Sequence, residues 1–492
     1  MRVPFGEWLP DFYDLGNPGI PYVKNVVPYQ GSYLPLRSVG QITDAINARA
    51  RGAYTAKSKE GTVYGYTGNE TKLYSVSQAA HTDVTNTGGA YALGSESNWN
   101  FTKWGETIIA VAIEENPQVI TFGGTNFADL AGSPPKAKHI TVVNNFVVLA
   151  NVNDGTARPQ RVVWSGINDS TDWTQDAATQ SDFQDLFSEA NQGGGEIQGL
   201  IGGEYLTVIQ EFSVWRAEYV GSPLIFEFRE VLPGIGTPCK NSIVSEGRIS
   251  HFVGQDGFYE LIDGTSVSPI GKNKVDKFFF DDLDEDYYHR VVGAQDPANQ
   301  LVAWIYPGAG NTSGTPNKII IYDWFNKKWG YGEITLEWIY NSLGSGFTLE
   351  ELDDVNSSID AISPSLDARV WKGGALEFAV YDSDNKKGAF GGTALDATIE
   401  TAEFELSEGT RSHLTGVRPL VDGLDVSTNV QIGTRNLQSN EEFFTDPVSP
   451  ESTTGIAHFR SDNRYHRIRV NTSGDFTHAL GVDVFGQPSG KR

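Results

Sequence analysis

The order of hydrophobic and polar positions along the chain predicts short strands throughout. Residues 317–331 contain an apolar run from Ile319 to Tyr322, a tight Asp-Trp-Phe-Asn-Lys-Lys turn, and then Trp329. A short apolar run that ends in a turn is typical of a buried strand, so this segment predicts a β-hairpin. Strand, turn and closing aromatic residue correspond to the outer half of a β-propeller blade, and weaker copies of the unit recur along the chain.

The recurring units have a regular length. When one third-strand residue is taken from each unit, neighbours lie roughly 45–60 residues apart, close to the length of a propeller blade. A four-stranded blade cannot bury both of its faces alone, so blades stack around an axis. We therefore predict an all-β chain with a β-propeller of six or seven blades over residues 49–390, and an array of two-sheet sandwiches is the alternative. The residues used as markers are Tyr74, Ile120, Trp164, Trp215, Tyr259, Tyr322 and Trp371.

The segments outside the repeat have different compositions. Residues 1–48 carry a proline every few positions, which favours an extended N-terminal arm over a helix or a central strand. Its aromatic side chains have to pack on their own domain or on a neighbouring subunit, so Phe5, Trp8, Phe12 and Tyr13 are candidate assembly contacts. Residues 391–492 read as strands and turns and predict a C-terminal β-sandwich, which would serve as an assembly or platform domain.

Two acidic segments interrupt the repeat, near 174–195 and near 348–364. Each has room for a short helix, and we expect both to be loops on one rim of the propeller.

The charge of the chain restricts its partners. It has 37 basic and 62 acidic residues and a formal net charge of −25. Tight binding to nucleic acid comes from Lys and Arg that displace counterions, so this composition argues against a protein that grips phosphate backbones. It is compatible with a surface that DNA slides past, and equally with simple solubility. The main basic cluster is Arg460, Arg464, Arg467 and Arg469, which would pair with phosphate or, more readily in so acidic a protein, with carboxylates of a neighbouring subunit.

The sequence contains no recognisable catalytic motif. Its single cysteine, Cys239, cannot form an intrachain disulfide, and the eight histidines do not have zinc-ligand spacing. We therefore predict no enzymatic activity, no catalytic residue, no cofactor and no metal site. Glycoside hydrolysis needs two facing carboxylates, which the sequence cannot single out among 62 acids, so a carbohydrate-binding or carbohydrate-hydrolysing propeller remains an alternative, as does a general interaction scaffold. The N-terminus lacks a signal-peptide pattern, and no apolar run reaches the ~18 residues of a membrane span, so we expect synthesis in the cytoplasm.

Several sequence blocks, taken in order, resemble one phage family. They cover nearly the whole chain: Pro4–Gly19 (PFGEWLPDFYDLGNPG), Lys24–Pro28 (KNVVP), Trp164–Trp173 (WSGINDSTDW), Gly202–Pro223, Asp256–Phe280, Pro316–Trp324 (PNKIIIYDW) and Gly486–Arg492. Together they are similar to the tail-nozzle or tail-hub proteins of short-tailed phages, which include packaged-DNA stabilisation proteins.

The resemblance implies a virion protein of the phage tail that is made in the host cytoplasm. It implies a propeller-based subunit that assembles, typically as a hexamer, below the portal and adaptor rings. Such a ring closes the channel after packaging and conducts DNA, without sequence-specific binding, during ejection. The expected partners are further copies of the chain, the tail adaptor or head-to-tail connector proteins, and tail fibre, spike or needle proteins.

Overall fold

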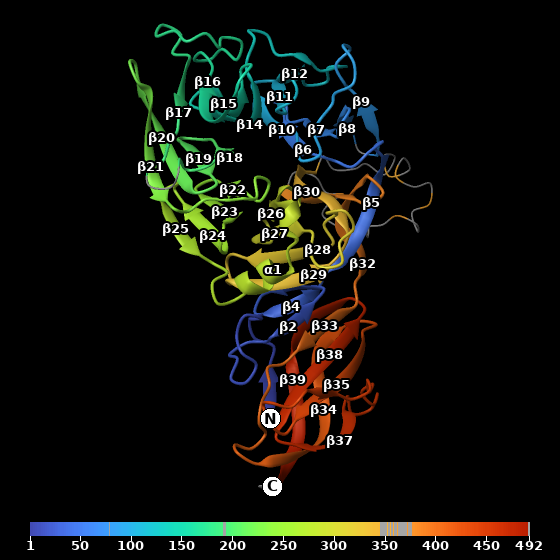
Figure 1. The fold of residues 1–492 in the computed structure, drawn as a ribbon. Helices are drawn as coiled ribbons and strands as arrows, with labels where there is room; N and C mark the ends of the chain where they lie inside the picture. Colours follow the sequence, from blue (N-terminus) through green and yellow to red (C-terminus); the bar gives the residue numbers. More distant parts are fainter. Residues whose placement is uncertain are drawn as a thin grey trace.

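The fold is almost entirely β in this computed structural model (Figure 1). It describes residues 1–77, 79–189, 193–344 and 376–490, together with residues 352, 355, 358, 362 and 371. A ring of sheets forms a β-propeller, and a two-sheet domain that holds most of the C-terminal hundred residues lies beneath it. Within the continuous described ranges, the helices are α1 (Asp276–Asp282) and the 3-10 helix η1 (Glu285–Arg290), both between the fifth and sixth blades. None of the helices in the described part of the chain is long and apolar enough to cross a membrane.

The propeller has seven four-stranded antiparallel blades within the described residues. The first six are each built from four consecutive strands, the first of which is innermost. Blade 1 is β6 (Ala53–Lys57), β7 (Val63–Gly68), β8 (Leu73–Val76) and β9 (His81–Asp83); blade 2 is β10 (Asn100–Trp104), β11 (Thr107–Val111), β12 (Gln118–Thr121) and β13 (Ala128–Asp129); blade 3 is β14 (Lys136–Val143), β15 (Phe146–Asn153), β16 (Ala157–Trp164) and β17 (Asp182–Asp185). Blade 4 is β18 (Ile197–Ile201), β19 (Leu206–Gln210), β20 (Ser213–Gly221) and β21 (Ile225–Pro233); blade 5 is β22 (Val244–Glu246), β23 (Ile249–Val253), β24 (Phe258–Ile262) and β25 (Ser266–Pro269); blade 6 is β26 (Val292–Asp296), β27 (Leu301–Tyr306), β28 (Lys318–Asp323) and β29 (Lys328–Glu333).

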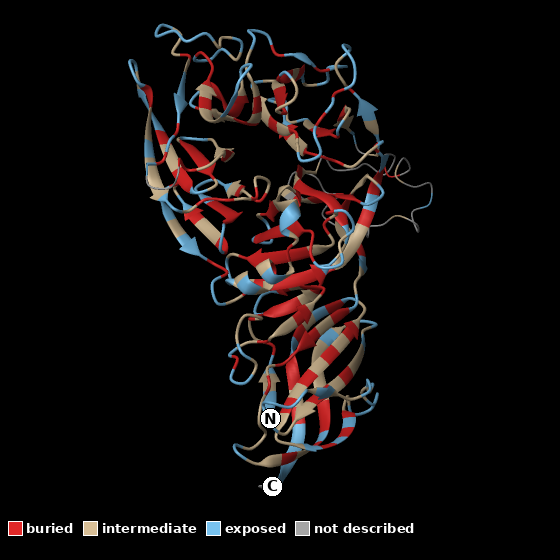
Figure 2. Ribbon diagram, viewed as in Figure 1, coloured by how far each residue is buried: buried red, intermediate tan, exposed pale blue. Residues whose placement is uncertain are grey.

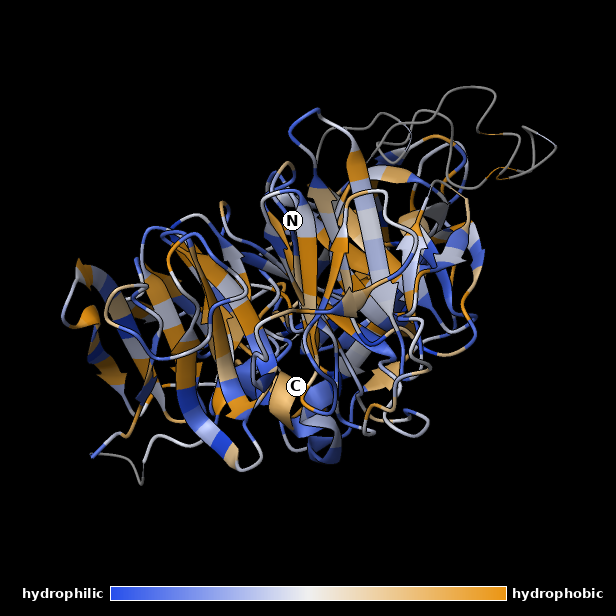
Figure 3. Cartoon of the chain, turned by 90° about the horizontal axis from the view of Figure 1, so that it is seen from above, coloured by the Kyte–Doolittle hydropathy of each residue, from blue (hydrophilic) through white to orange (hydrophobic). Residues whose placement is uncertain are grey.

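The second strands of blades 2 to 6 are buried along almost their whole length (Figure 2). Every residue of β27 is buried, in keeping with its sequence LVAWIY. The predicted hairpin is β28–β29, in which Ile320 pairs with Tyr331. Figure 3, which looks along a different direction, shows apolar residues running along the strands of the sheets. Stacked blades remove both faces of each inner strand from water, which explains why these strands are continuous apolar runs and not alternating ones.

The seventh blade is made from both ends of the repeat. Its strands are β30 (Leu336–Leu343), β31 (Leu376–Asp382), β32 (Lys386–Ala394) and, outermost, β5 (Arg37–Ala45). Two predicted boundaries are therefore corrected: the arm ends before β5 and not at residue 48, and the propeller extends to Ala394 and not to 390. The cause is non-local pairing, because β5 joins the propeller only through hydrogen bonds to β32.

One predicted rim insertion contains a strand of the propeller. The segment near 174–195 includes β17, which pairs with β16 as the fourth strand of blade 3, and its described residues contain no helix. The short polar sequence DFQD is compatible with an exposed edge strand, which is why the pattern resembled a loop. The other predicted insertion, near 348–364, lies outside the described residues except for positions 352, 355, 358 and 362.

The C-terminal domain is a β-sandwich of two sheets. One sheet has the order β1 (Arg2–Pro4), β39 (Phe476–Gly490), β34 (Arg411–Gly423) and β37 (Ala457–Asn463). The other has the order β2 (Tyr22–Lys24), β33 (Ala397–Glu400), β38 (Tyr465–Ser473), β35 (Ser427–Arg435) and β36 (Phe443–Phe444). Alternate residues of β38 are buried, among them Ile468 and Val470, so one face of this sheet builds the sandwich core and the other faces outward.

The N-terminal arm joins the two domains. It gives β1 and β2 to the two sheets of the sandwich, and its hairpin β3 (Val26–Tyr29)–β4 (Ser32–Pro35) packs against blade 6. A Cβ on Gly330 would lie 2.6 Å from the Val26 carbonyl oxygen, so the hairpin needs a glycine at that point of β29. Trp8, Ile20 and Tyr33 belong to one continuous hydrophobic core that also contains residues of the propeller and of the sandwich. The arm therefore packs between the propeller and the sandwich and contacts both.

Candidate functional site

The aromatic residues predicted as assembly contacts have different environments. Phe5 and Trp8 are only 2% and 1% exposed. The Trp8 ring meets Phe278 edge-on at a centroid distance of 5.0 Å and lies 5.7 Å from Tyr331. Of the two alternatives for these rings, packing on their own chain holds for Phe5 and Trp8, which leaves little of either side chain for a neighbouring subunit.

The other two arm residues are more accessible. Phe12 is half-buried, and Tyr13 is 73% exposed at the surface of the loop before Asp14. Of the four aromatic candidates, Tyr13 is the one whose ring is mostly free to meet another molecule.

The arm is fastened to the propeller by polar contacts as well. The Asp11 carboxylate accepts hydrogen bonds from the main-chain N–H groups of Lys277 (2.9 Å) and Phe278 (2.8 Å) in the first turn of α1. Lys274 Nζ lies 2.6 Å from Glu7 Oε1. Burial, together with the nearby charge of Asp11, raises the pKa of Asp276 to about 7. Two arm carboxylates thus pair with the segment that leads into α1.

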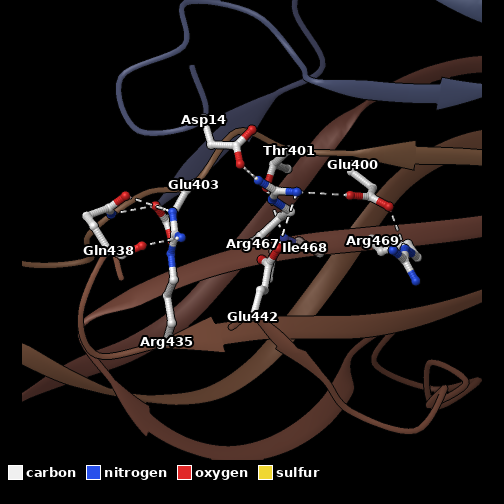
Figure 4. A network of polar contacts seen from close by, with 10 residues as sticks. All are labelled: Asp14, Glu400, Thr401, Glu403, Arg435, Gln438, Glu442, Arg467, Ile468 and Arg469. Carbon is white, nitrogen blue, oxygen red and sulfur yellow. Dashed lines mark hydrogen bonds and ion pairs between the residues drawn. The ribbon is translucent and has the colours of Figure 1, made fainter. Parts of the chain in front are cut away.

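Arg467 and Arg469 lie on the outward face of the five-stranded sheet and are paired within the chain (Figure 4). Arg467 contacts Asp14 of the arm at 2.5 Å, Glu442 at 3.3 Å and Glu400 at 3.5 Å, and Arg469 Nε lies 2.6 Å from Glu400 Oε1. The predicted pairing with carboxylates is present, but these carboxylates belong to the same chain and not to a neighbour.

A second ion pair continues this network. Arg435 Nε and Nη2 lie 2.5 and 2.7 Å from the two oxygens of Glu403, and Gln438 Nε2 donates to the same carboxylate at 2.8 Å. Burial acts to raise the pKa of Glu403, but the hydrogen bonds from Arg435 and Gln438 outweigh it and hold this pKa below its usual value. The outward face of the sheet is therefore a paired ionic surface that fixes the arm loop around Asp14.

The predicted cluster of four arginines is not one patch. Arg460 is exposed on β37, which belongs to the other sheet of the sandwich, and Arg464 is half-buried between β37 and β38. Alternation along the strands and a change of sheet separate residues that lie close in sequence. Arg460 is the most accessible of the four to another molecule.

A site that sequence reasoning missed lies at one mouth of the propeller. The segments that lead into the innermost strands carry charged residues, and three cations hold the segment before β10. Lys240 Nζ donates to the main-chain oxygen of Glu96 at 2.5 Å, Arg49 Nη2 donates to that of Ser95 at 2.9 Å, and Arg51 donates to that of Gly94. Burial, with help from Lys138, lowers the pKa of Lys240 to about 8.

Neighbouring segments around the same mouth are ion-paired. Lys138 Nζ lies 2.6 Å from Glu196 Oε2, and Arg290 Nη2 lies 2.5 Å from Glu337 Oε2. Between Lys138, Lys240 and the segment before β10 remains a hollow of about 20 Å³, which is room for one water molecule. Charged residues spread over six blades give no local sequence signal, so only the fold brings them together.

These contacts can hold neighbouring segments of the propeller together, but the described residues here form no set of metal ligands. Among the described residues, no group of three or more His, Cys, Asp or Glu side chains could hold a metal ion. Cys239 is buried, and burial raises the pKa of its thiol. Contacts between segments of several blades therefore tie this mouth of the propeller together.

Comparisons with known proteins identify similar folds and no relative in sequence. No protein-family profile and no curated protein matches the chain. Among solved structures, the WD40 domain of Neurospora crassa Pan2 is similar with a TM-score of 0.40 and 7% identity, over 73% of this chain and 96% of that one. BamB from Moraxella catarrhalis is similar with a TM-score of 0.34 and 7% identity, over 74% and 92%, and the computationally designed Ika8 protein with a TM-score of 0.38 and 9% identity, over 79% and 95%.

Proposed function

We propose that the protein is a structural subunit of the tail of a short-tailed phage, a nozzle or hub component that assembles as a ring below the portal and adaptor. The ring, typically of six copies, closes the DNA channel after packaging and conducts DNA during ejection. The subunit is made in the host cytoplasm and remains in the virion tail, where it contacts the adaptor and the fibre, spike or needle proteins.

One structural observation carries this proposal. Two of the family-like sequence blocks, Pro4–Gly19 and Asp256–Phe280, are packed on each other, with Asp11 bound to the first turn of α1 and Trp8 against Phe278. A third block, Pro316–Trp324, contains strand β28, which pairs with β29, and β29 carries the Tyr331 ring that packs near Trp8. These three blocks therefore lie at or beside the junction of the arm with the propeller, which supports a subunit built as one rigid body.

The closed mouth of the propeller restricts where DNA could pass. Lys240 and Glu96 bridge the propeller axis, so in the proposed assembly the conduit lies between subunits and not through a single propeller. A net charge of −25 favours weak repulsion between such a conduit and the phosphate backbone, which lets DNA move instead of binding it.

The mass of the purified protein in solution tests the proposal. Light scattering is measured for the protein alone and then with the preceding tail-adaptor ring. We expect a six-fold ring to form on the adaptor, and electron microscopy of that ring should show a lumen lined mostly by Asp and Glu. A protein that stays monomeric under both conditions, or a lumen lined mostly by Lys and Arg, would contradict the proposal.

A further inference from the structure

A cleft of about 540 Å³ opens between blades 4 and 5. Its walls are the hairpins β18–β19 and β22–β23, together with the turn at Gly264. The blades touch where Ile243 lies over Gly199, at which a Cβ would be 2.3 Å from Ile243 Cδ1. The volume lies within the range of roughly 300–1,000 Å³ that small-molecule sites occupy. Part of its lining, from Gly202 to Thr207, falls in the sequence block Gly202–Pro223, and the cleft is separate from the mouth described above.

An aromatic ring with a fixed orientation lines the cleft. The guanidinium carbon of Arg216 lies 3.9 Å from the centroid of the Tyr205 ring, and Arg216 Nη1 donates to the Asp263 carbonyl oxygen at 2.7 Å. Gly264 leaves room for the ring, because a Cβ there would lie 3.1 Å from Tyr205 Cε2 and its φ is +65°. Arg216 covers one face of the ring, and Tyr205 is partly exposed as part of the cleft lining.

Polar groups surround the ring at two depths. At the rim, the Arg248 and Glu204 side chains are 71% and 82% exposed and only loosely paired, at 3.8 Å. Deeper in the cleft, the hydroxyl groups of Ser245 and Ser250 lie 3.1 Å apart. The rim groups can therefore turn toward a ligand without breaking a strong internal contact.

We propose that this cleft binds a neutral oligosaccharide, with a pyranose ring stacked on Tyr205 and its hydroxyl groups bound by Arg248 and Glu204. A pyranose has an apolar C–H face that suits the negative face of an aromatic ring, and its neighbouring hydroxyl groups suit planar carboxylate and guanidinium groups. The apolar wall at Leu200 and Ile201 and the inner hydroxyls match a ligand with both characters.

The charges of the cleft select a neutral ligand. Arg216 lies 2.9 Å from Glu218, and Arg248 lies 3.4 Å from Asp263, so each guanidinium already has a carboxylate neighbour. The chain as a whole carries −25 charges, which disfavours phosphorylated or uronic sugars.

Binding of three neutral probes to the full chain tests the proposal. Maltohexaose, cellohexaose and chitohexaose are titrated by calorimetry and by saturation-transfer NMR. We expect at least one of them to bind and Tyr205→Ala to weaken that binding by about tenfold, the effect of one lost aromatic stack. Tyr29→Ala is the matched control, because Tyr29 is 38% exposed, lies in a hairpin and stacks on His478, and its removal should leave binding unchanged.

Further variants guard against a folding defect. Tyr205→Phe keeps the stack and should bind like the wild type, while Arg248→Ala changes an exposed side chain and should weaken binding by about threefold. If none of the three probes binds, or if binding is the same in Tyr205→Ala and Arg248→Ala as in the wild type, the proposal is wrong. This outcome is independent of ring formation, which is measured by mass, so the two proposals fail separately.

Discussion

The ammonium group of Lys240 donates a hydrogen bond to the main-chain oxygen of Glu96, 2.5 Å away, across one mouth of the propeller. Lys240 precedes blade 5 and Glu96 precedes blade 2, so the contact joins blades that are not neighbours in the ring. Arg49 and Arg51 bind the same segment from the side of blade 1. The mouth is therefore closed by a few contacts that can be removed one at a time.

Lys240→Ala should loosen the segment that precedes β10. Loss of a charge-assisted hydrogen bond, worth about 1.5–3 kcal/mol, should speed amide exchange in residues 94–98 by about tenfold or more. Hydrogen exchange followed by mass spectrometry measures this locally, with Lys59→Ala, an exposed lysine in the turn after β6, as the control. Unchanged exchange in residues 94–98 would show that Arg49 and Arg51 hold the segment alone.

Trp8→Ala should destabilise the junction between the domains. The ring is 1% exposed and packs against Phe278 and Tyr331, and loss of such a tryptophan costs about 3–5 kcal/mol of unfolding free energy. Urea unfolding should then show the sandwich and the propeller melting in separate steps. Tyr13→Ala, at a 73% exposed position of the same arm, should change the unfolding free energy by less than about 0.5 kcal/mol. Equal effects of the two substitutions would contradict the packing described here.

Asp276 should make stability depend on pH. Burial raises its pKa from an ordinary value of 3.8 to about 7. Between these values the unfolded chain has lost the proton that the folded protein still holds. The contribution of the Asp276 carboxyl group to the unfolding free energy therefore falls as pH rises from about 4 to about 7, and it is constant above pH 7.

Asp276→Asn removes this dependence. The amide oxygen can still accept the hydrogen bond from Phe258 N–H but carries no charge. The unfolding free energy of the variant should therefore increase relative to that of the wild type as pH rises to about 7. The increase should be about 1–2 kcal/mol once solvent screening is counted. Denaturation at pH 5 and pH 8 measures the difference, and Asp281→Asn, at an exposed position of α1, is the control. A gain that is larger at pH 5 than at pH 8 would contradict the assignment.

Arg467→Ala should release the arm loop from the sandwich. The side chain is 11% exposed and contacts Asp14, Glu400 and Glu442. Its removal takes this cation from Glu442 and from the partly exposed Asp14, while Glu400 keeps Arg469, so the cost should be about 1–3 kcal/mol. Limited proteolysis should then cut the loop near Asp14. Arg460→Ala, a change at an exposed arginine seven positions earlier, should leave both stability and the cleavage pattern unchanged.

The repeat was predictable because its signal is local. Six of the seven marker residues, from Tyr74 to Tyr322, do lie in the third strands of consecutive blades, where packing between blades favours aromatic or apolar residues. Trp371 lies outside the strands of the seventh blade. That blade takes its outer strand from residues 37–45, and nothing in RSVGQITDA names a partner that lies far along the chain.

The candidate site was less predictable because its contacts are non-local. The sequence shows that Arg467 and Arg469 lie two positions apart in a strand, which places them on one face, but it does not show that Asp14 and Glu400 come to meet them. Likewise, Trp8 had to be packed somewhere, and only the fold decides between a neighbouring subunit and the chain's own blade 6.

The seventh blade combines β5 with strands from the far end of the repeat, so it can form only late in synthesis. Lys386 and Gln41, which are hydrogen-bonded in the finished blade, are 345 residues apart. A ribosome that adds about 5–20 residues per second emits the second of them roughly 20–70 seconds after the first. During that interval Arg37–Ala45 has no partner strand, and the growing propeller is an open arc. A message truncated before Ala394 therefore yields a chain that can stack blades but cannot lock the ring.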